Sequence, residues 1–201
     1  MSGLQHGPLN ERTVHLCIDM QRIFSTEGPW PTPWMERVLP TVVRIVERFP
    51  ERTVFTRFIT PERPEDMPGA WRQYYERWRE TTRERLDTRM LDLMPPLGKF
   101  APPAAVIDKP VYSAFAGHKL ADYLRERGAD TLVVTGSETD VCVLATVLGA
   151  VDHGYRVVVV ADGLCSSSDE GHDTLLALYS KRFSRQIETA DAETILSSWE
   201  K

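Results

Sequence analysis

Short apolar runs alternate along the chain with stretches in which apolar residues recur at helical spacing. The runs typical of strands are rich in valine and cover residues 13–19, 52–58, 104–108, 131–136 and 156–162. The stretches typical of helices lie at about 36–49, 117–127, 140–152, 169–182 and 191–199. Gly128 and Gly154 stand where two of these helices end, a position that favours a left-handed residue. Since buried parallel strands are almost continuously apolar, the pattern predicts a doubly wound, three-layer α/β fold with a mainly parallel sheet between helices.

The segment 59–103 interrupts this alternation, because it is rich in proline at both ends and carries the sequence GAWRQYYERWRETTRERL between them. Four aromatic residues in it have the spacing i, i+3, i+4 and i+7 of one helix face: Trp71, Tyr74, Tyr75 and Trp78. This aromatic stripe can pack on the rest of the domain or on a second subunit, and it can also form a wall of a substrate pocket. We therefore expect the insertion 59–103 at the active edge of the sheet or at a subunit interface.

Composition and charge narrow the class of protein and partner. The chain has 201 residues, 42% of them hydrophobic, which is enough for one sizeable core, so we expect residues 1–201 to form a single domain. A formal charge of -5 attracts neither nucleic acid nor an anionic membrane, so we expect small-molecule or protein partners, with a small molecule as the substrate. No run has the pattern of a secretory leader or a membrane span, and three scattered cysteines make no disulfide framework, so we expect a cytoplasmic protein.

Three polar residues stand at the predicted carboxyl ends of strands, where ligands bind in open α/β sheets. They are Asp19 in CIDMQRIF, Lys109 in VIDKPVYSAF and Cys142 in GSETDVCV. Each alone has a structural explanation: the aspartate can cap a turn, the lysine can be a solvated charge, and the cysteine can be a core residue. Together they offer a base, a cation and a nucleophile, and the N–H groups of the turn before the cysteine can hold an oxyanion. A helix that begins after an N-cap at Thr139 or Asp140 would also favour a thiolate in its first turn.

Several ordered motifs resemble those of the isochorismatase-like cysteine hydrolases, from LCIDMQRIF through KPVYSAF and GSETDVCVLATVLGAVDHGYRVVVVADGLCSS to GHDTLLAL. This family includes nicotinamidases, N-carbamoylsarcosine amidohydrolases, biuret hydrolases, ureidoacrylate amidohydrolases and isochorismatase itself. The resemblance covers nearly the whole chain and implies a catalytic triad of Asp19, Lys109 and Cys142. It also implies a cis peptide bond between Ser137 and Glu138, beside the oxyanion hole. In the amidase members the thiolate attacks a carbonyl, ammonia or an amine leaves, and water hydrolyses the thioester.

The chain departs from the nicotinamidase pattern, in which an Asp-x-His arrangement after the second strand and a further histidine bind a metal. Its own segment, FTRFITPERPEDMPGAW, has no histidine. No pair of the five histidines has metal-site spacing, so we expect neither a metal nor another cofactor. His118, in SAFAGHKL, stands where many relatives have a threonine.

Three classes of function fit these residues. The favoured class is a metal-independent cysteine hydrolase that cleaves a carbon–nitrogen bond of a small amide, ureide or carbamoyl compound through a thioester. An isochorismatase-type vinyl-ether hydrolase, which uses the aspartate without the cysteine, is one alternative, and the presence of Cys142 argues against it. A non-catalytic α/β binding module is the other. A dinucleotide-binding version of it is excluded, because DMQRIF replaces the glycine-rich turn after the first strand.

Other residues are candidates for the pocket and for association. Phe24, Trp71, Tyr112 and Phe115 are candidate substrate contacts, with ordinary core burial as the alternative. Cys165, in DGLCSSSD, follows the fifth strand at the same edge. Members of the resembled family are commonly dimers or larger, and segment 59–103 has more aromatic area than a small domain usually leaves exposed. We therefore expect a homo-oligomer, either a dimer or a tetramer.

Overall fold

A computed structural model describes residues 4–199 of the protein. Its centre is a parallel sheet of six strands in the order β3-β2-β1-β4-β5-β6. The strands are β1 (Thr13–Ile18), β2 (Thr53–Phe58), β3 (Ala105–Lys109), β4 (Thr131–Ser137), β5 (Arg156–Cys165) and β6 (Ile187–Ala190). The strand order reverses at β1, which pairs with β2 on one side and with β4 on the other. Such a reversal opens a crevice at the carboxyl ends of the strands.

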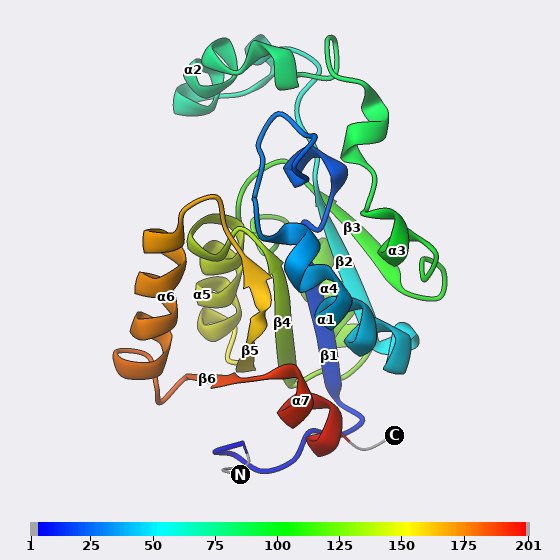
Figure 1. Cartoon of the computed structure of the whole chain (residues 1–201), viewed down its shortest axis with the longest axis vertical. Helices are drawn as coiled ribbons and strands as arrows, with labels where there is room; N and C mark the ends of the chain where they lie inside the picture. Colours follow the sequence, from blue (N-terminus) through cyan, green and yellow to red (C-terminus); the bar gives the residue numbers. More distant parts are fainter. Residues whose placement is uncertain (1–3, 200–201) are drawn as a thin grey trace.

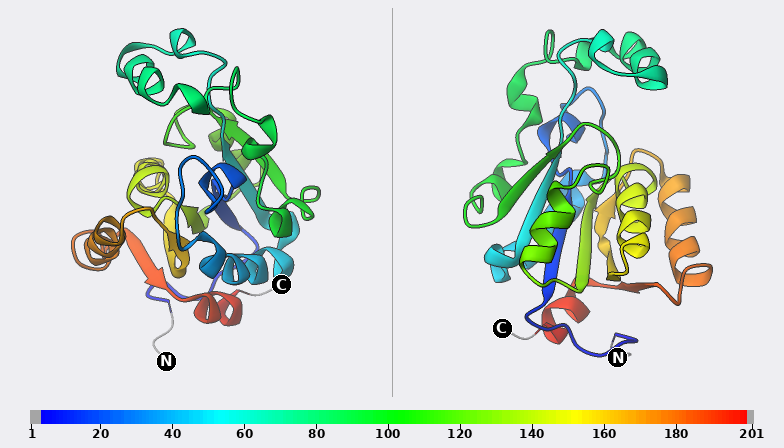
Figure 2. Two further views of the ribbon diagram at one scale, coloured as in Figure 1. Left: turned by 45° about the horizontal axis from the view of Figure 1, so that its top comes forward. Right: turned by 180° about the vertical axis from the view of Figure 1, so that it is seen from behind.

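Helices cover both faces of this sheet. They are α1 (Met35–Arg48), α2 (Gly69–Arg77), α3 (Pro95–Gly98), α4 (Lys119–Glu126), α5 (Leu144–Asp152), α6 (Asp169–Lys181) and α7 (Ala192–Ser198). Short 3-10 turns span Arg22–Phe24, Pro50–Arg52, Pro64–Asp66, Arg79–Thr81 and Thr88–Leu91. The helices α1 and α7 lie on one face, and α4, α5 and α6 lie on the other (Figures 1 and 2). The predicted doubly wound, three-layer α/β fold is therefore confirmed.

The central strands are buried on both sides, as their apolar sequences predict. Every residue of β1 and β4 is buried, and α1 packs an apolar face that includes Val38, Val42 and Val46 against the sheet. The predicted helix ends are also confirmed, because Gly128 and Gly154 have φ values of 61° and 83°.

The strands β1 and β4 approach each other closely at Gly136. Its φ is 120°, and a Cβ built at this position would overlap the backbone of Ile18. Only glycine fits there. This contact sets the position of the chain that leaves β4 for the candidate site.

The segment 59–103 extends beyond the carboxyl ends of the strands. Its longest helix, α2, lies above the loop that follows β1, and α3 lies beside the sheet (Figure 1). One residue of the aromatic stripe, Tyr75, is fully buried. Packing on the protein's own core was one of the roles expected for the stripe, and Tyr75 has this role.

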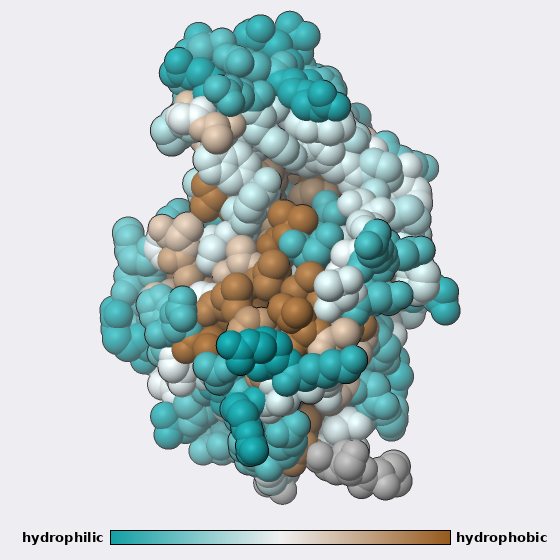
Figure 3. Space-filling model, turned by 90° about the vertical axis from the view of Figure 1, so that its left-hand side faces the viewer, coloured by the Kyte–Doolittle hydropathy of each residue, from teal (hydrophilic) through white to brown (hydrophobic). Residues whose placement is uncertain are grey.

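A broad apolar area covers the outer side of α5 and α6 (Figure 3). The apolar residues there that are only partly buried include Leu144, Leu148, Val151, Leu175 and Leu176, and Leu178 is 39% exposed. Within residues 4–199, none of the helices has the length and apolarity that crossing a membrane requires.

Candidate active site

Asp19 directly follows β1 and has a φ of 46°, a left-handed conformation that aspartate adopts more readily than most residues. The residue is fully buried. Thr56 in β2 donates its hydroxyl to Asp19 Oδ1 at 2.5 Å and accepts the backbone N–H of Asp19 at 3.1 Å. Thr56 thus holds both the backbone and the carboxylate of Asp19. Sequence reasoning missed it, since a threonine within an apolar strand gives no signal of such a contact.

Lys109 ends β3 and reaches across the edge of the sheet to Asp19. Its Nζ lies 2.6 Å from Asp19 Oδ2 and donates a hydrogen bond to Val111 O at 3.1 Å. The same nitrogen lies 5.0 Å from the ring centroid of Phe58. Burial lowers the pKa of Lys109, but the negative charge of Asp19 opposes this and the net pKa is raised. The lysine therefore carries its charge although it is only 4% exposed.

Cys142 lies on a π-helical turn, Thr139–Val143, between β4 and α5. The chain enters this turn through a cis peptide bond between Ser137 and Glu138. The residue in the N-cap position is Glu138, and its side chain makes no capping hydrogen bond. The predicted N-cap at Thr139 or Asp140 is therefore wrong.

Both predicted caps are occupied by residues from later in the chain. Thr139 donates its hydroxyl to Cys165 O at 3.2 Å and lies 2.8 Å from His172 Nδ1. The carboxylate of Asp140 accepts a hydrogen bond from Ser166 Oγ. These tertiary contacts tie the turn to the end of β5 and to α6.

Asp19 and Lys109 are the two charged groups that act on the thiol of Cys142. Burial is the largest cause that raises the pKa of Cys142, the charge of Asp19 raises it further, and the cation of Lys109 lowers it. The net pKa lies well above its ordinary value. The prediction that the helix start favours a thiolate is therefore wrong for the free site. The arrangement instead places a protonated thiol beside a carboxylate that can accept its proton.

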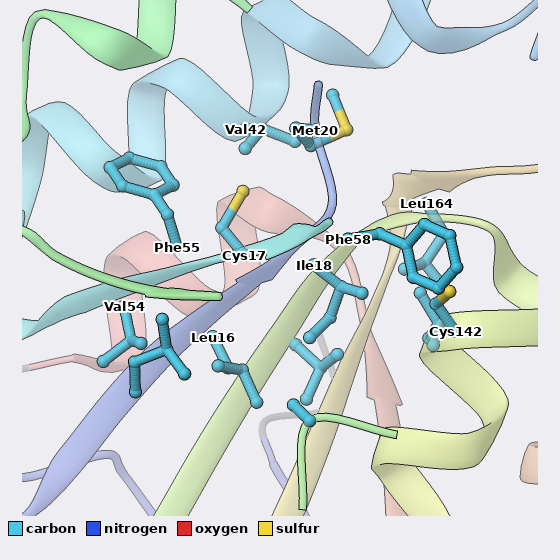
Figure 4. Close-up of a cluster of buried hydrophobic side chains, with 14 of the residues drawn as sticks. Leu16, Cys17, Ile18, Met20, Val42, Val54, Phe55, Phe58, Cys142 and Leu164 are labelled. Atoms are coloured by element: carbon cyan, nitrogen blue, oxygen red, sulfur yellow. The ribbon is translucent and has the colours of Figure 1, made fainter. Parts of the chain in front are cut away.

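Cys142 faces a pocket of about 360 Å³ at the carboxyl ends of the strands. The lining residues are Phe24, Pro29, Trp30, Pro31, Phe58, Tyr74, Trp78, Tyr112, Glu138, Val141, Cys142 and Ser167. In the close-up, the side chain of Cys142 lies beside the ring of Phe58 (Figure 4). Half of the lining residues are aromatic, so Cys142 lines a largely apolar pocket with few polar groups.

The four predicted substrate contacts separate into two pairs. Phe24 and Tyr112 line the pocket, whereas Trp71 and Phe115 are not among its lining residues. Trp71 packs against Tyr112 with ring centroids 4.7 Å apart, and Phe115 stacks on His153 at 4.8 Å. Trp71 therefore supports a lining residue from behind, and Phe115 belongs to a different aromatic contact.

The aromatic stripe also contributes directly to the pocket through Tyr74 and Trp78, which the sequence placed on the same helix face as Trp71. Trp30 and Phe58 complete the walls. The loop EGPWPTPW, with a tryptophan between two prolines soon after Asp19, is the signal in the sequence for Trp30.

Cys165 is the last residue of β5 rather than a residue after it, because β5 extends beyond the predicted end at residue 162. It is 1% exposed and lines a separate cavity of about 260 Å³ with Trp34 and His172. It is not a lining residue of the pocket that contains Cys142.

The residues present do not fit the metal site of the nicotinamidase pattern. The segment after β2 has no histidine. Within the described part of the chain, no three His, Cys, Asp or Glu side chains are grouped so that they could hold a metal ion.

Comparison with protein families gives one extended match. The sequence profile of the Isochorismatase domain matches residues 13–191. The "Uncharacterized isochorismatase family protein YwoC" of Bacillus subtilis is 25% identical over 187 residues, which cover 90% of this chain and 92% of that protein. The match to the "Uncharacterized isochorismatase family protein PncA" of Bacillus subtilis is more local. It has 38% identity over 81 residues, and it spans 40% of this chain and less than half, 44%, of that protein.

Solved structures resemble the fold over most of its length. The crystal structure of nicotinamidase PncA from Bacillus subtilis superposes with a TM-score of 0.71 at 25% sequence identity. The superposition covers 88% of this chain and 99% of that chain.

Proposed function

Since the chain belongs to the isochorismatase family of hydrolases, we propose that it is a metal-independent cysteine hydrolase for the carbon–nitrogen bond of a small amide, ureide or carbamoyl compound. One observation carries the proposal. Lys109 Nζ lies 2.6 Å from Asp19 Oδ2, the charges of both groups act on the thiol of Cys142, and Cys142 lines a pocket that fits a small molecule. A nucleophile, a proton acceptor and a cation thus meet at one point.

The proposed reaction begins when Asp19 takes the proton of Cys142 as Sγ attacks the carbonyl carbon of the substrate. A carbon–sulfur bond forms, and the carbonyl oxygen becomes an oxyanion that the backbone N–H groups of Glu138 and Cys142 stabilise. The carbon–nitrogen bond then breaks, and Asp19 returns the proton to the leaving ammonia or amine. Lys109 keeps the developing negative charge at this site compensated throughout, because its ammonium lies 2.6 Å from Asp19 and its charge also acts on Cys142.

Water completes the cycle by hydrolysing the thioester. Asp19 accepts a proton from the water while the water oxygen attacks the thioester carbon. The carbon–sulfur bond then breaks, and Asp19 returns the proton to the thiolate of Cys142. The products are the amine and a carboxylic or carbamic acid. The raised pKa of Cys142 fits this sequence, because attack requires proton transfer to Asp19 and not a preformed thiolate.

Two variants distinguish this proposal from its alternatives when ammonia release is measured over a panel of small amides and ureides. The Cys142→Ala variant should lose turnover by at least about a thousandfold, because the nucleophile is gone. Cys165→Ala is the matched control, since this second buried cysteine lies at the same edge outside the pocket, and it should keep wild-type activity. Ammonia release that survives in Cys142→Ala would refute the mechanism.

A vinyl-ether hydrolase of the isochorismatase type would behave differently. Its reaction would be lost in Asp19→Asn and retained in Cys142→Ala, and it would release no ammonia. A binding module would show no turnover at all. The presence of Cys142 in the pocket, where the charges of Asp19 and Lys109 act on its thiol, favours the amide hydrolase.

The apolar area over α5 and α6 supports the further proposal that two copies of the chain associate through it. Leu178, which is 39% exposed on α6, is the residue to change. Light scattering at micromolar concentration should give at least twice the chain mass of 22.9 kDa, and Leu178→Glu should reduce it. A monomeric wild type would contradict the association. The cytoplasmic location expected from the sequence stays a prediction.

A further inference from the structure

We propose that the pocket selects amides whose non-reacting part is an apolar cation, such as a quaternary ammonium group, over neutral isosteres, and that it excludes anionic amides. The reason is its lining, which has six aromatic rings and the single carboxylate of Glu138 but no cationic side chain. This inference rests on the proposed function and specifies its substrate class.

The aromatic lining forms a continuous group around Trp30. Its ring centroid lies 6.0 Å from that of Phe24, 6.1 Å from Phe58, 6.0 Å from Tyr74 and 6.2 Å from Trp78. Groups of aromatic rings around one space bind quaternary ammonium ions through the negative faces of their π systems. A carboxylate lying along these faces meets the same negative charge, because the donors of the rings, the indole N–H groups and the tyrosine hydroxyls, lie at their edges.

Glu138 adds a fixed negative charge to one wall. Its Oε2 accepts hydrogen bonds from Ser167 Oγ at 2.5 Å and from Ser167 N at 3.2 Å, and Ser166 Oγ lies within hydrogen-bond distance at 3.4 Å. No ion pair joins Glu138 to a cation among residues 4–199. The carboxylate is therefore held in place by neutral donors that leave its charge uncompensated.

The charge of Glu138 acts across the pocket. Burial is the main cause that raises the pKa of Tyr74 and of Tyr112, and the negative charge of Glu138 contributes to both shifts. These two tyrosines come from α2 and from the loop after β3, so they report the field of Glu138 at separate walls. A bound anion would meet the same repulsion.

The nearby cations do not offset this field. Lys109 is paired with Asp19 at 2.6 Å, and the pair carries no net charge. The guanidinium of Arg77 lies 5.8 Å from the ring centroid of Trp78, but Arg77 is exposed and is not a lining residue. A cationic substrate would thus supply the charge that the pocket lacks.

Three small amides of nearly equal size test the inference. Betaine amide carries a trimethylammonium group, 3,3-dimethylbutanamide is its neutral isostere, and succinamate carries a carboxylate. We would measure their binding to the Cys142→Ala variant by calorimetry and their hydrolysis by the wild type through ammonia release. We expect the cation to bind about tenfold more tightly than the neutral isostere, and the anion at least about tenfold more weakly.

The Glu138→Gln variant removes the charge and keeps the shape of the side chain. It should reduce the preference for the cation and reduce the discrimination against succinamate. If Glu138→Gln fails to fold, a second variant tests the same inference. Trp78→Leu, made in the same Cys142→Ala background, removes one ring and leaves the carboxylate, and it should lower the ratio of the affinity for the cation to that for the neutral isostere. Three results would overturn the inference. They are equal affinity for the cation and its isostere, binding of succinamate as tight as that of either, and no detectable binding of the cation at millimolar concentration.

The two proposals can fail separately in this experiment. If the affinities follow the expected order but the wild type releases no ammonia, the proposed hydrolase function is contradicted and the proposed preference for cations is supported. Hydrolysis of succinamate in preference to the other two would support the hydrolase and contradict the selectivity.

Discussion

The hydroxyl of Thr56 should be needed both for the stability of the protein and for the position of Asp19. Thr56→Val replaces the hydroxyl by a methyl group of similar volume at a fully buried site. It removes one hydrogen bond to a carboxylate oxygen and leaves the backbone N–H of Asp19 without an acceptor. A hydrogen bond to a charged group contributes about 1.5–3 kcal/mol, and an orphaned buried donor costs about 1–3 kcal/mol. We therefore expect a loss of about 3 kcal/mol in the free energy of unfolding, which lowers Tm by about 6–12 °C in a chain of this size.

Urea and thermal unfolding measure the stability, and ammonia release measures the activity. Since the carboxylate of Asp19 loses the group that orients it, kcat/KM should fall by about 10- to 100-fold. Thr60→Val is a matched control, because the hydroxyl of Thr60 is also buried and has no hydrogen-bond partner in the structure. Its loss should leave the free energy of unfolding unchanged or slightly higher. If the two variants unfold at the same urea concentration and hydrolyse substrate at the same rate, the assignment to Thr56 is wrong.

Three other expectations concern pH, backbone packing and thiol reactivity. Burial lowers the pKa of His15 to about 3, so below pH 6.5 the unfolded chain binds more protons than the folded protein, which loses stability as the pH falls. Between pH 6.5 and about 5 the loss in the free energy of unfolding is about 2 kcal/mol. Urea titrations should show this loss in the wild type and not in His15→Leu. Gly136→Ala places a Cβ on the backbone of Ile18 and should cost at least about 3 kcal/mol, so circular dichroism that shows wild-type thermal stability would contradict the close approach of β1 and β4. Peptide mapping after iodoacetamide treatment should find Cys142 modified before Cys17, because Cys142 lines the pocket while Cys17 is 0% exposed and has its pKa raised to about 12 by burial.

The sequence predicts the layered fold well because its strong signals are local. Each central strand is a continuous run of buried residues, and period and length distinguish it from the helices around it. The edge strand β6 was missed, since its four residues, IETA, are short and half polar and become a strand only by pairing with β5. The wrong N-cap has a similar origin. Thr139 has the right residue type and place, but contacts with residues 26 and 33 positions later use its hydroxyl.

The candidate site was predictable only in part. Strand ends identify where Asp19, Lys109 and Cys142 lie, because the carboxyl ends of parallel strands share one edge. The walls of the pocket depend on how loops fold over that edge, and Trp30 and Tyr74 belong to segments that no periodicity places together. The pKa of Cys142 was misjudged for a related reason. The helix start and the lysine are visible in the sequence, whereas burial, which outweighs them, is a property of the folded chain.

The segment between β2 and β3 has its two ends on neighbouring strands, with Phe58 paired to Lys109 in the parallel ladder. Loop-closure entropy rises slowly with length, by about 0.6 kcal/mol for each doubling, so the outer part of this excursion can change in length at little cost, provided that buried residues such as Leu97 and Tyr75 are kept. The residues that would perform the chemistry stand on the sheet edge, while Tyr74 and Trp78 stand on the excursion. The chain thus carries these two walls of the pocket in a stretch separate from the candidate catalytic residues, whereas Trp30 and Glu138 lie outside that stretch. Grafting its outer part between members of the family should accordingly change two walls of the pocket and leave the candidate catalytic residues in place.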